Sequence, residues 1–158
     1  MGRSPVICKK GTKKELNSKL MLFYTGMMRV SSSILAEQKQ QTNSNRKHLD
    51  RIVELSEELR ESLTENDLSR FGKILHEGWL NKRKLASGIT NAKINEYYER
   101  ARKAGAVGGK ILGAGGGGFL LLYCEQENQN NVREALSELK ESPFKFEPQG
   151  SKIIYVSD

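Results

Sequence analysis

The sequence is poor in the residues that most often build metal sites and rigid turns. Its 158 residues include two cysteines, two histidines and three prolines. Cys8 and Cys124 do not form the closely spaced pairs of a structural zinc site, and His76-Glu77 lacks the second histidine of a zinc-protease helix. We therefore expect no metal site built from protein ligands.

Long apolar runs are also absent. No stretch approaches the roughly 18 consecutive apolar residues of a membrane-spanning helix, and lysines interrupt the segment from Met1 to Ser18, which therefore does not resemble a secretory signal. The sequence predicts a cytoplasmic protein of one domain, preceded by a polar arm or domain-boundary segment: residues 1–17 form the arm and residues 18–158 the domain.

The charge is unbalanced towards the positive side. With 26 Lys and Arg against 19 Asp and Glu, the formal net charge is +7, which suits nucleic acid, an anionic surface or phosphorylated small molecules. No aromatic residues interleave with the basic ones, which favours a solvated surface over a nucleic-acid or membrane footprint. We expect neither of those partners.

The hydrophobic pattern predicts alternating sheet and helix. Residues 19–25 and 119–124 are short apolar runs typical of buried strands. Helical spacing of apolar residues predicts helices ending near residue 63, over 68–86, over 91–104 and over 131–141, and the three serines at 31–33 are interpreted as a helix start. Two short strands are expected within 145–157. This order predicts an α+β fold in which helices pack on one face of an antiparallel sheet.

Eight glycines crowd the segment from 105 to 118, and four of them are consecutive. Glycine is costly in a packed chain, so such a run indicates positive φ angles or a close approach by another group. Successive amides without side chains form an anion-binding concavity, which favours phosphate. A tight crossing of backbone on backbone explains the glycines equally well. The segment lacks the Lys-Ser/Thr ending of a Walker A loop, and it leads into a strand rather than a helix, unlike a Rossmann loop.

The segment KILGAGGGGF (110–119) resembles the third conserved motif of the GHMP kinases. The segment LFYTGMMRVSSSIL from Leu22, and HEGWLNKRKLASGITNAKINEYYERARKAGAVGGK from His76, are similar to the D-glycero-D-manno-heptose 7-phosphate kinases and related bacterial sugar kinases. The resemblance covers the chain from about residue 20 to its end. It implies the carboxy-terminal, ferredoxin-like domain of an ATP-dependent sugar-phosphate kinase.

The resemblance also implies roles for individual residues. The loop residues would support the ATP phosphates: Gly113, Ala114, Gly115, Gly116, Gly117 and Gly118. Candidates for the sugar-phosphate site are Arg29, His76, Trp79, Lys82 and Arg83, and three of these share a helix face by their spacing. The alternative for that face is an ordinary core tryptophan beside solvated charges.

The family's principal ATP loop and its catalytic acid have no counterpart in this sequence. We therefore assign no catalytic residue, and expect ATP and Mg²⁺ to be bound mainly by an amino-terminal kinase domain. The expected partners are ATP, a phosphorylated sugar and that domain. The chain alone should be inactive, and an apolar patch near the glycine loop should support a homo-oligomer. The alternative is a freestanding small-molecule or nucleotide-binding module.

Overall fold

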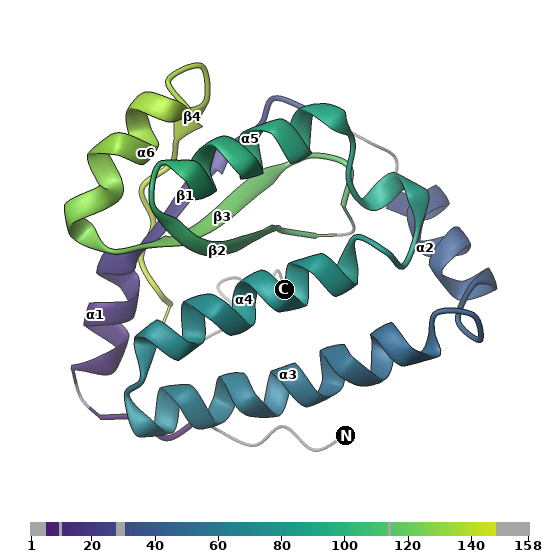
Figure 1. The fold of residues 1–158 in the computed structure, drawn as a ribbon, viewed down its shortest axis with the longest axis horizontal. Helices are drawn as coiled ribbons and strands as arrows, with labels where there is room; N and C mark the ends of the chain where they lie inside the picture. Colours follow the sequence, from purple (N-terminus) through teal and green to yellow (C-terminus); the bar gives the residue numbers. More distant parts are fainter. Residues whose placement is uncertain (1–5, 10, 28–30, 114, 148–158) are drawn as a thin grey trace, which may run out of the picture.

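A computed structural model describes residues 6–9, 11–27, 31–113 and 115–147 (Figure 1). The elements follow in the order α1 (Thr12–Lys19), β1 (Leu20–Tyr24), α2 (Ser31–Gln40), α3 (Arg46–Glu65), α4 (Leu68–Lys82), η1 (Ser87–Ile89), α5 (Ala92–Lys103), β2 (Ala106–Ile111), β3 (Phe119–Cys124), η2 (Gln126–Asn128), α6 (Gln129–Ala135) and β4 (Lys140–Glu141). Among the described residues, no helix is both long and apolar enough to cross a bilayer.

The described strands form one antiparallel sheet in the order β2-β3-β1-β4. Strands β1 and β3 lie side by side, so Leu20 pairs with Tyr123 and Tyr24 with Phe119. The predicted α+β class is confirmed. The sequence did not predict β2, because Gly108 and Gly109 interrupt its apolar pattern. These two glycines sit in the strand because other backbone lies against them.

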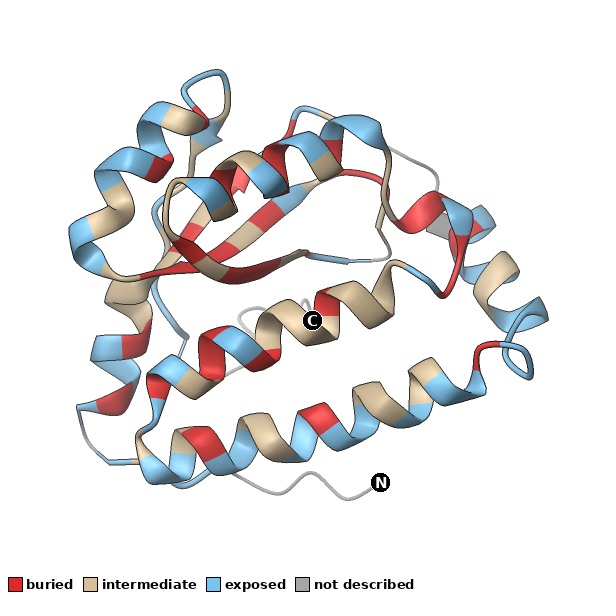
Figure 2. Cartoon of the chain, in the orientation of Figure 1, coloured by how far each residue is buried: buried red, intermediate tan, exposed pale blue. Residues whose placement is uncertain are grey.

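One face of the sheet carries the main core. Met21 and Phe23 of β1 pair with Leu122 and Leu120 of β3, so these four side chains share a face. All four are at most 2% exposed, and α5 and α6 cover them (Figures 1 and 2). On the opposite face, Tyr123 belongs to a second, smaller cluster with residues of α1 and α4. The sheet is therefore buried on both faces near β3's carboxyl end.

Helix α4 packs along β2, an edge strand of the described sheet. A Cβ atom at Gly108 would lie 2.1 Å from the carbonyl oxygen of Gly72 and 2.8 Å from the amide nitrogen of His76. A Cβ at Gly72 would lie 2.6 Å from the Tyr123 ring. Glycine at both positions lets helix backbone approach strand backbone, which fixes where α4 sits on the sheet.

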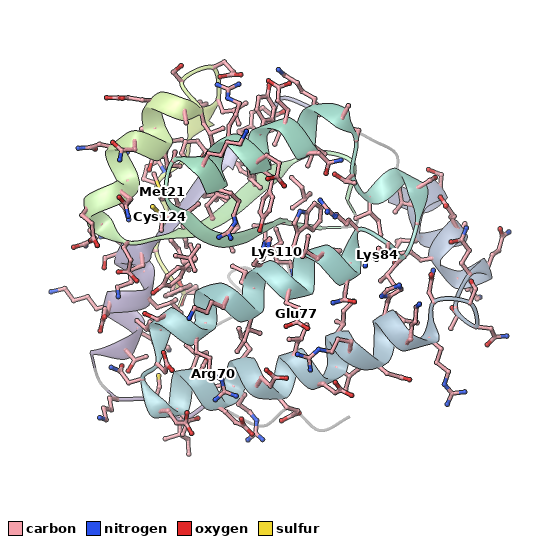
Figure 3. All side chains as sticks on the ribbon, viewed as in Figure 1. Met21, Arg70, Glu77, Lys84, Lys110 and Cys124 are labelled. Carbon is pink, nitrogen blue, oxygen red and sulfur yellow. The ribbon has the colours of Figure 1, made fainter. Side chains whose placement is uncertain are left out.

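Helices α3 and α4 form an antiparallel hairpin at the edge of the molecule (Figure 1). Asn66 ends α3 in the left-handed region at φ 62°, and the Asp67 side chain caps α4 by accepting from the Arg70 amide. Ion pairs join the two helices: Glu77 of α4 binds Arg51 of α3, and Arg70 of α4 reaches Glu61 and Glu65 of α3 (Figure 3). These exposed ion pairs contribute little stability individually.

Several predicted element boundaries were wrong. The helix predicted over 68–86 ends at Lys82, where Arg83 is its C-cap. The helix predicted over 131–141 ends at Ala135, and the chain then turns so that Lys140 and Glu141 can pair with β1. Residues 145–147 are not a strand, and the other predicted terminal strand lies outside the described residues. The helix start at Ser31 is confirmed.

Candidate functional site

The glycine-rich segment is the loop of the β2–β3 hairpin, which the Leu112 amide closes by donating to the Phe119 carbonyl at 2.9 Å. Four described glycines in the loop have positive φ: Gly113 (87°), Gly115 (116°), Gly116 (76°) and Gly118 (87°). Side-chain-bearing residues rarely adopt this backbone region. The loop's path therefore requires glycine at these positions, whatever it binds. Ala114 lies outside the described residues.

Two distant segments of the chain hold this loop. The Gly116 amide donates to the Ile89 carbonyl at 2.8 Å, and the Gly118 amide donates to the Met27 carbonyl at 2.9 Å. A Cβ at Gly117 would lie 2.2 Å from the Met27 carbonyl oxygen, and one at Gly115 would lie 2.6 Å from the Ile89 Cα. Gly115 and Gly117 are thus glycines because the loop crosses other backbone closely.

The loop amides differ in what they bind. Those of Gly116 and Gly118 are engaged by the backbone carbonyls just described, whereas no hydrogen bond from the amides of Gly115 or Gly117 occurs within the described residues. The two kinds alternate along the loop. An anion could therefore be held only by the second kind, without breaking the contacts that shape the loop.

The segment that supports the loop from one side is itself anchored. The Glu37 carboxylate of α2 accepts from the Ser87 amide at 2.8 Å and from the Ser87 hydroxyl at 3.0 Å. These hydrogen bonds lower the pKa of Glu37. Helix α2 thereby fixes η1, whose last residue, Ile89, touches the loop.

Lys82 connects α4 to the loop. Its ammonium nitrogen donates to the Gly113 carbonyl at 2.7 Å. Partial burial, and then the nearby charge of Lys110, lower the pKa of Lys82. The two lysines therefore place positive charge beside the loop, as an anion site requires.

Two of the other predicted substrate residues, His76 and Trp79, contact Tyr98 of α5. The His76 Nδ1 atom is 2.6 Å from the Tyr98 hydroxyl, and the two rings stack with centroids 5.8 Å apart. Trp79 is 1% exposed, with its ring centroid 6.2 Å from that of Tyr98. Arg83 is the C-cap of α4. Arg29 lies outside the described residues. Lys82 is thus the predicted substrate residue that the structure places against the loop.

Burial determines the charge state of His76. Its pKa is lowered, first by burial and then by the Arg102 charge, while Glu99 acts in the opposite direction. The ring is therefore neutral near pH 7. Its contact with the buried Tyr98 hydroxyl joins α4 to α5, which is the role of a residue that positions the helix.

The sequence interpretation missed several residues that surround the loop. Lys110 belongs to the glycine-rich motif, but the sequence predicted no role for it because it did not predict β2. Thr25, whose amide and hydroxyl donate to the Gly118 carbonyl at 2.9 and 2.8 Å, was predicted as the end of the first strand and was not assigned to the site. No sequence pattern marks Ile89. The side chains of Tyr24, Leu112 and Phe119 are exposed beside the loop.

Within the described ranges, the acidic residues do not gather into a metal site. The described residues contain no group of three or more His, Cys, Asp or Glu side chains that could hold an ion. No step is therefore assigned to a metal held by the described residues.

Comparison with known proteins supports a kinase family. The family described as GHMP kinases C terminal matches residues 59–141. D-glycero-alpha-D-manno-heptose 7-phosphate kinase of Campylobacter jejuni is 25% identical over 154 residues, which cover 94% of this chain and 45% of that protein. A mevalonate kinase of Thermococcus onnurineus is 29% identical over 149 residues, covering 90% of this chain and 40% of the enzyme. The chain thus spans less than half the length of these relatives.

Solved structures share the fold. A D-glycero-D-manno-heptose 1-phosphate kinase from Bacteroides thetaiotaomicron matches with a TM-score of 0.61 at 25% identity, over 90% of this chain and 37% of that one. The L. major mevalonate kinase in complex with R-mevalonate matches with a TM-score of 0.67 at 16% identity, over 77% of this chain and 40% of that one. The second match shows the fold alone.

Proposed function

The chain belongs to the GHMP kinases C-terminal family, and we propose from this premise that it is the carboxy-terminal part of an ATP-dependent sugar-phosphate kinase. We take heptose 7-phosphate as the substrate, because a heptose 7-phosphate kinase matches nearly the whole chain. The family match over a glycine loop built of positive-φ residues is the observation that carries this proposal.

In this proposal the glycine loop lies against the ATP phosphates. The amides of Gly115 and Gly117 are the donors offered to phosphate oxygens, since those of Gly116 and Gly118 already bind backbone carbonyls. Amides fixed in place stabilise charge that develops during phosphoryl transfer without reorganising at the moment of reaction. The loop would then act by position and charge, and it supplies no proton acceptor.

Lys82 is the proposed phosphate contact from α4. Its ammonium group already lies at the loop, bound to the Gly113 carbonyl, and a lysine acts on phosphate as a mobile point charge. His76 and Trp79 belong to the same proposal as positioning residues, because both contact Tyr98 and so set where α4 lies. We retain Arg29 and Arg83 as further candidates for the sugar phosphate.

The remaining machinery is proposed to lie in an amino-terminal kinase domain. That domain would carry the principal ATP loop and the catalytic acid, and would hold most of the contacts to ATP and Mg²⁺. The Mg²⁺ would neutralise phosphate charge when bound with ATP. Phosphoryl transfer depends on assembling both halves around the substrates, so the 158-residue chain alone would be inactive.

The test is a coupled assay of ADP release with ATP and heptose 7-phosphate, with mevalonate as the comparison substrate. We expect turnover on the order of 1–100 per second from the full-length enzyme and none from the 158-residue chain. A full-length enzyme that phosphorylates mevalonate and not heptose 7-phosphate would overturn the substrate assignment. Full turnover by the 158-residue chain would overturn the proposal that this chain needs an amino-terminal domain for activity.

A matched pair of variants tests Lys82 in the full-length enzyme. Lys82→Met should lower kcat/KM at least about tenfold, equivalent to about 1.4 kcal/mol. Lys73→Met removes a charge from the exposed side of the same helix and should leave kcat/KM unchanged. Equal kinetics for the two variants would remove Lys82 from the phosphate site.

A further inference from the structure

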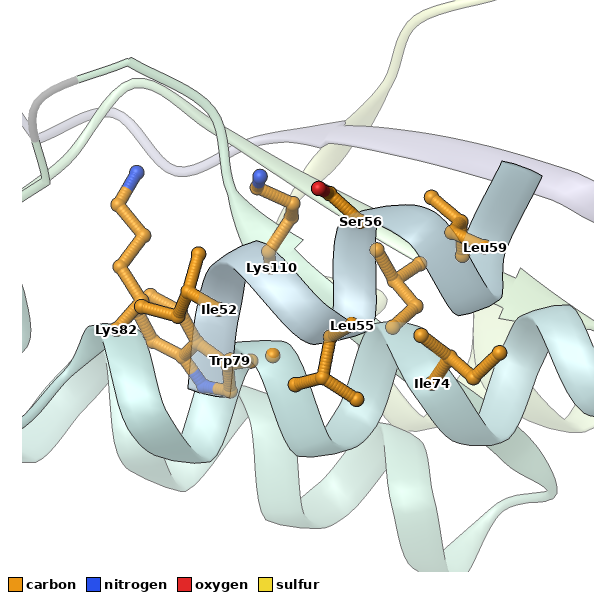
Figure 4. A pocket seen from close by; sticks show the side chains of 10 residues that line it. Ile52, Leu55, Ser56, Leu59, Ile74, Trp79, Lys82 and Lys110 are labelled. Atoms are coloured by element: carbon orange, nitrogen blue, oxygen red, sulfur yellow. The ribbon is translucent and has the colours of Figure 1, made fainter. Parts of the chain in front are cut away.

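A pocket outside the glycine loop lies between α3, α4 and β2. Its volume is about 160 Å³, and Figure 4 shows it from close by. Its lining consists of Ile52, Leu55, Ser56, Leu59, Ile74, Leu75, Gly78, Trp79, Lys82 and Lys110. The glycine loop's amides do not line it, although Lys82, the proposed phosphate contact, does.

The walls of this α3–α4 pocket are mostly aliphatic, with the Trp79 indole, the Ser56 hydroxyl and two lysines as the exceptions. Leu55 and Ile74 are buried at 3% and 7% exposure, and Trp79 at 1%. Gly78 leaves open space at the wall, since a Cβ there would meet nothing within 4 Å. Apolar cavities of about 150 Å³ accept a benzene-sized group. The pocket therefore suits one aromatic ring or a short branched alkyl group, and a long hydrocarbon chain would not fit.

Positive charge lies at one side of the same pocket. In Figure 4 the side chains of Lys82 and Lys110 extend to the same side, away from the apolar floor that Leu55 forms. Within the described part of the chain, neither ammonium group has a carboxylate partner. Most other described lysines and arginines on these helices are either fully exposed or paired.

Two neighbouring ammonium groups repel one another. The pKa of Lys82 is lowered first by burial and then by the Lys110 charge. An anion placed between them removes this repulsion and replaces it with two charge-assisted contacts. A phosphate monoester carries a charge of about −1.5 to −2 at pH 7, which matches two lysines, whereas a carboxylate matches one.

We propose that the α3–α4 pocket binds a small organic phosphate monoester, with its phosphate between Lys82 and Lys110 and a compact aromatic or branched alkyl group against Leu55, Ile74 and Trp79. The site goes beyond the proposed kinase function, although the two share Lys82, and Lys110 is the residue that belongs to the pocket alone. A neutral apolar molecule would leave the lysines uncompensated, and inorganic phosphate would leave the apolar walls unfilled. The preferred ligand therefore has both parts in one molecule.

Binding at this site acts on the glycine loop through one side chain. Lys82 lines the pocket and also donates to the Gly113 carbonyl at 2.7 Å. An anion in the pocket competes for that ammonium group and so loosens its contact with the loop. The ligand is therefore expected to raise hydrogen exchange in the loop, which marks the site as an effector site.

The experiment uses the fluorescence of Trp79, which is the sequence's one tryptophan and lines the pocket. The 158-residue chain is titrated with phenyl phosphate, inorganic phosphate and benzyl alcohol, with calorimetry as a second readout. Phenyl phosphate is expected to bind at least about tenfold more tightly than either other probe. Equal affinity for phenyl phosphate and inorganic phosphate would overturn the proposal, since the apolar walls would then contribute nothing.

Two pairs of variants locate the binding. Gly78→Leu fills the pocket and should abolish phenyl phosphate binding, while Gly78→Ala adds one methyl group and serves as its control. Lys110→Met should weaken binding at least about tenfold, while Lys73→Met on α4's exposed side should not change it. Circular dichroism tests whether each variant is folded. If Gly78→Leu is unfolded, the binding measurement on Lys110→Met alone tests whether the ligand lies in the pocket.

The outcomes separate this site from the proposed ATP contact. Phenyl phosphate binding that survives Gly78→Leu and Lys110→Met in folded protein, and that ATP displaces, would place the ligand at the glycine loop and overturn the pocket proposal. Binding that both variants abolish supports the pocket, whatever the kinase assays show.

Discussion

The sharpest structural prediction concerns the contact between α4 and β2. Gly108→Ala would place a Cβ atom 2.1 Å from the Gly72 carbonyl oxygen, whereas ordinary van der Waals contact begins near 3.4 Å. The obstacle is helix backbone, so no side chain can rotate away. Helix α4 would have to retreat by about 1.3 Å, or β2 would have to bend away from its partner β3.

The cost follows from what α4 buries. A gap of 0.5–1 Å already removes about a quarter to a half of each van der Waals attraction. Helix α4 contributes Trp79 to the main core and Leu68 and Phe71 to the smaller one. Overpacking of this kind costs about 1–3 kcal/mol and sometimes more. We expect about 3 kcal/mol for Gly108→Ala, which lowers the melting temperature by about 6–12 °C in a domain of this size.

The assay is urea unfolding followed by circular dichroism, with calorimetry for the melting temperature. Gly78→Ala is the matched control: it is also a glycine-to-alanine change, on α4 and in open space, and it should stabilise the helix by about 0.8–1 kcal/mol. Gly72→Ala should destabilise, because its Cβ would meet the buried Tyr123 ring at 2.6 Å. If the free energy of unfolding of Gly108→Ala lies within about 0.5 kcal/mol of the wild-type value, the close packing of α4 on β2 is refuted.

Three further predictions concern other residues. Burial lowers the pKa of His76 below its ordinary 6.5, so the unfolded chain takes up the proton first as the pH falls. The free energy of unfolding of the wild type should therefore decline below pH 6.5. The same measurement on His76→Asn should show a smaller decline. Asp67→Ala should cost about 1 kcal/mol in urea unfolding by removing the cap of α4, and Asp67→Ser should restore most of it. Gly117→Val should lower the full-length enzyme's activity at least about a hundredfold and also lower its melting temperature, because the Met27 carbonyl lies 2.2 Å from the new Cβ; normal kinetics in a folded variant would show that the loop is only a connection.

The sequence sufficed where one local signal dominates. Strands β1 and β3 are short apolar runs, and both appear at the expected positions. Helix α5 lies between Asn91, which caps it, and Gly105, whose φ of 111° ends it, and both signals are readable in the sequence.

The failures occur where a distant contact decides the structure. Strand β2 carries two adjacent glycines, which lower strand propensity, and the reason for Gly108 is a helix that begins 40 residues earlier at Leu68. The residues that support the loop were missed for the same reason. Met27 and Ile89 belong to no recognisable sequence motif, because they act through their backbone carbonyl oxygens. Trp79 illustrates a residue with two interpretations, of which burial favours the core.

The way the glycine loop is held has a consequence for folding kinetics. Its supports come from opposite regions of the chain: the hydrogen bond between the Thr25 hydroxyl and the Gly118 carbonyl joins residues 93 positions apart. Contacts of such long range form late, because the entropic cost of closing a large loop comes before the contact contributes any stabilisation. The α3–α4 hairpin, by contrast, is local and can form early. On mild destabilisation the order reverses, so the loop should open while both helices persist, and ligand binding should fail at denaturant concentrations at which helical circular dichroism is still native.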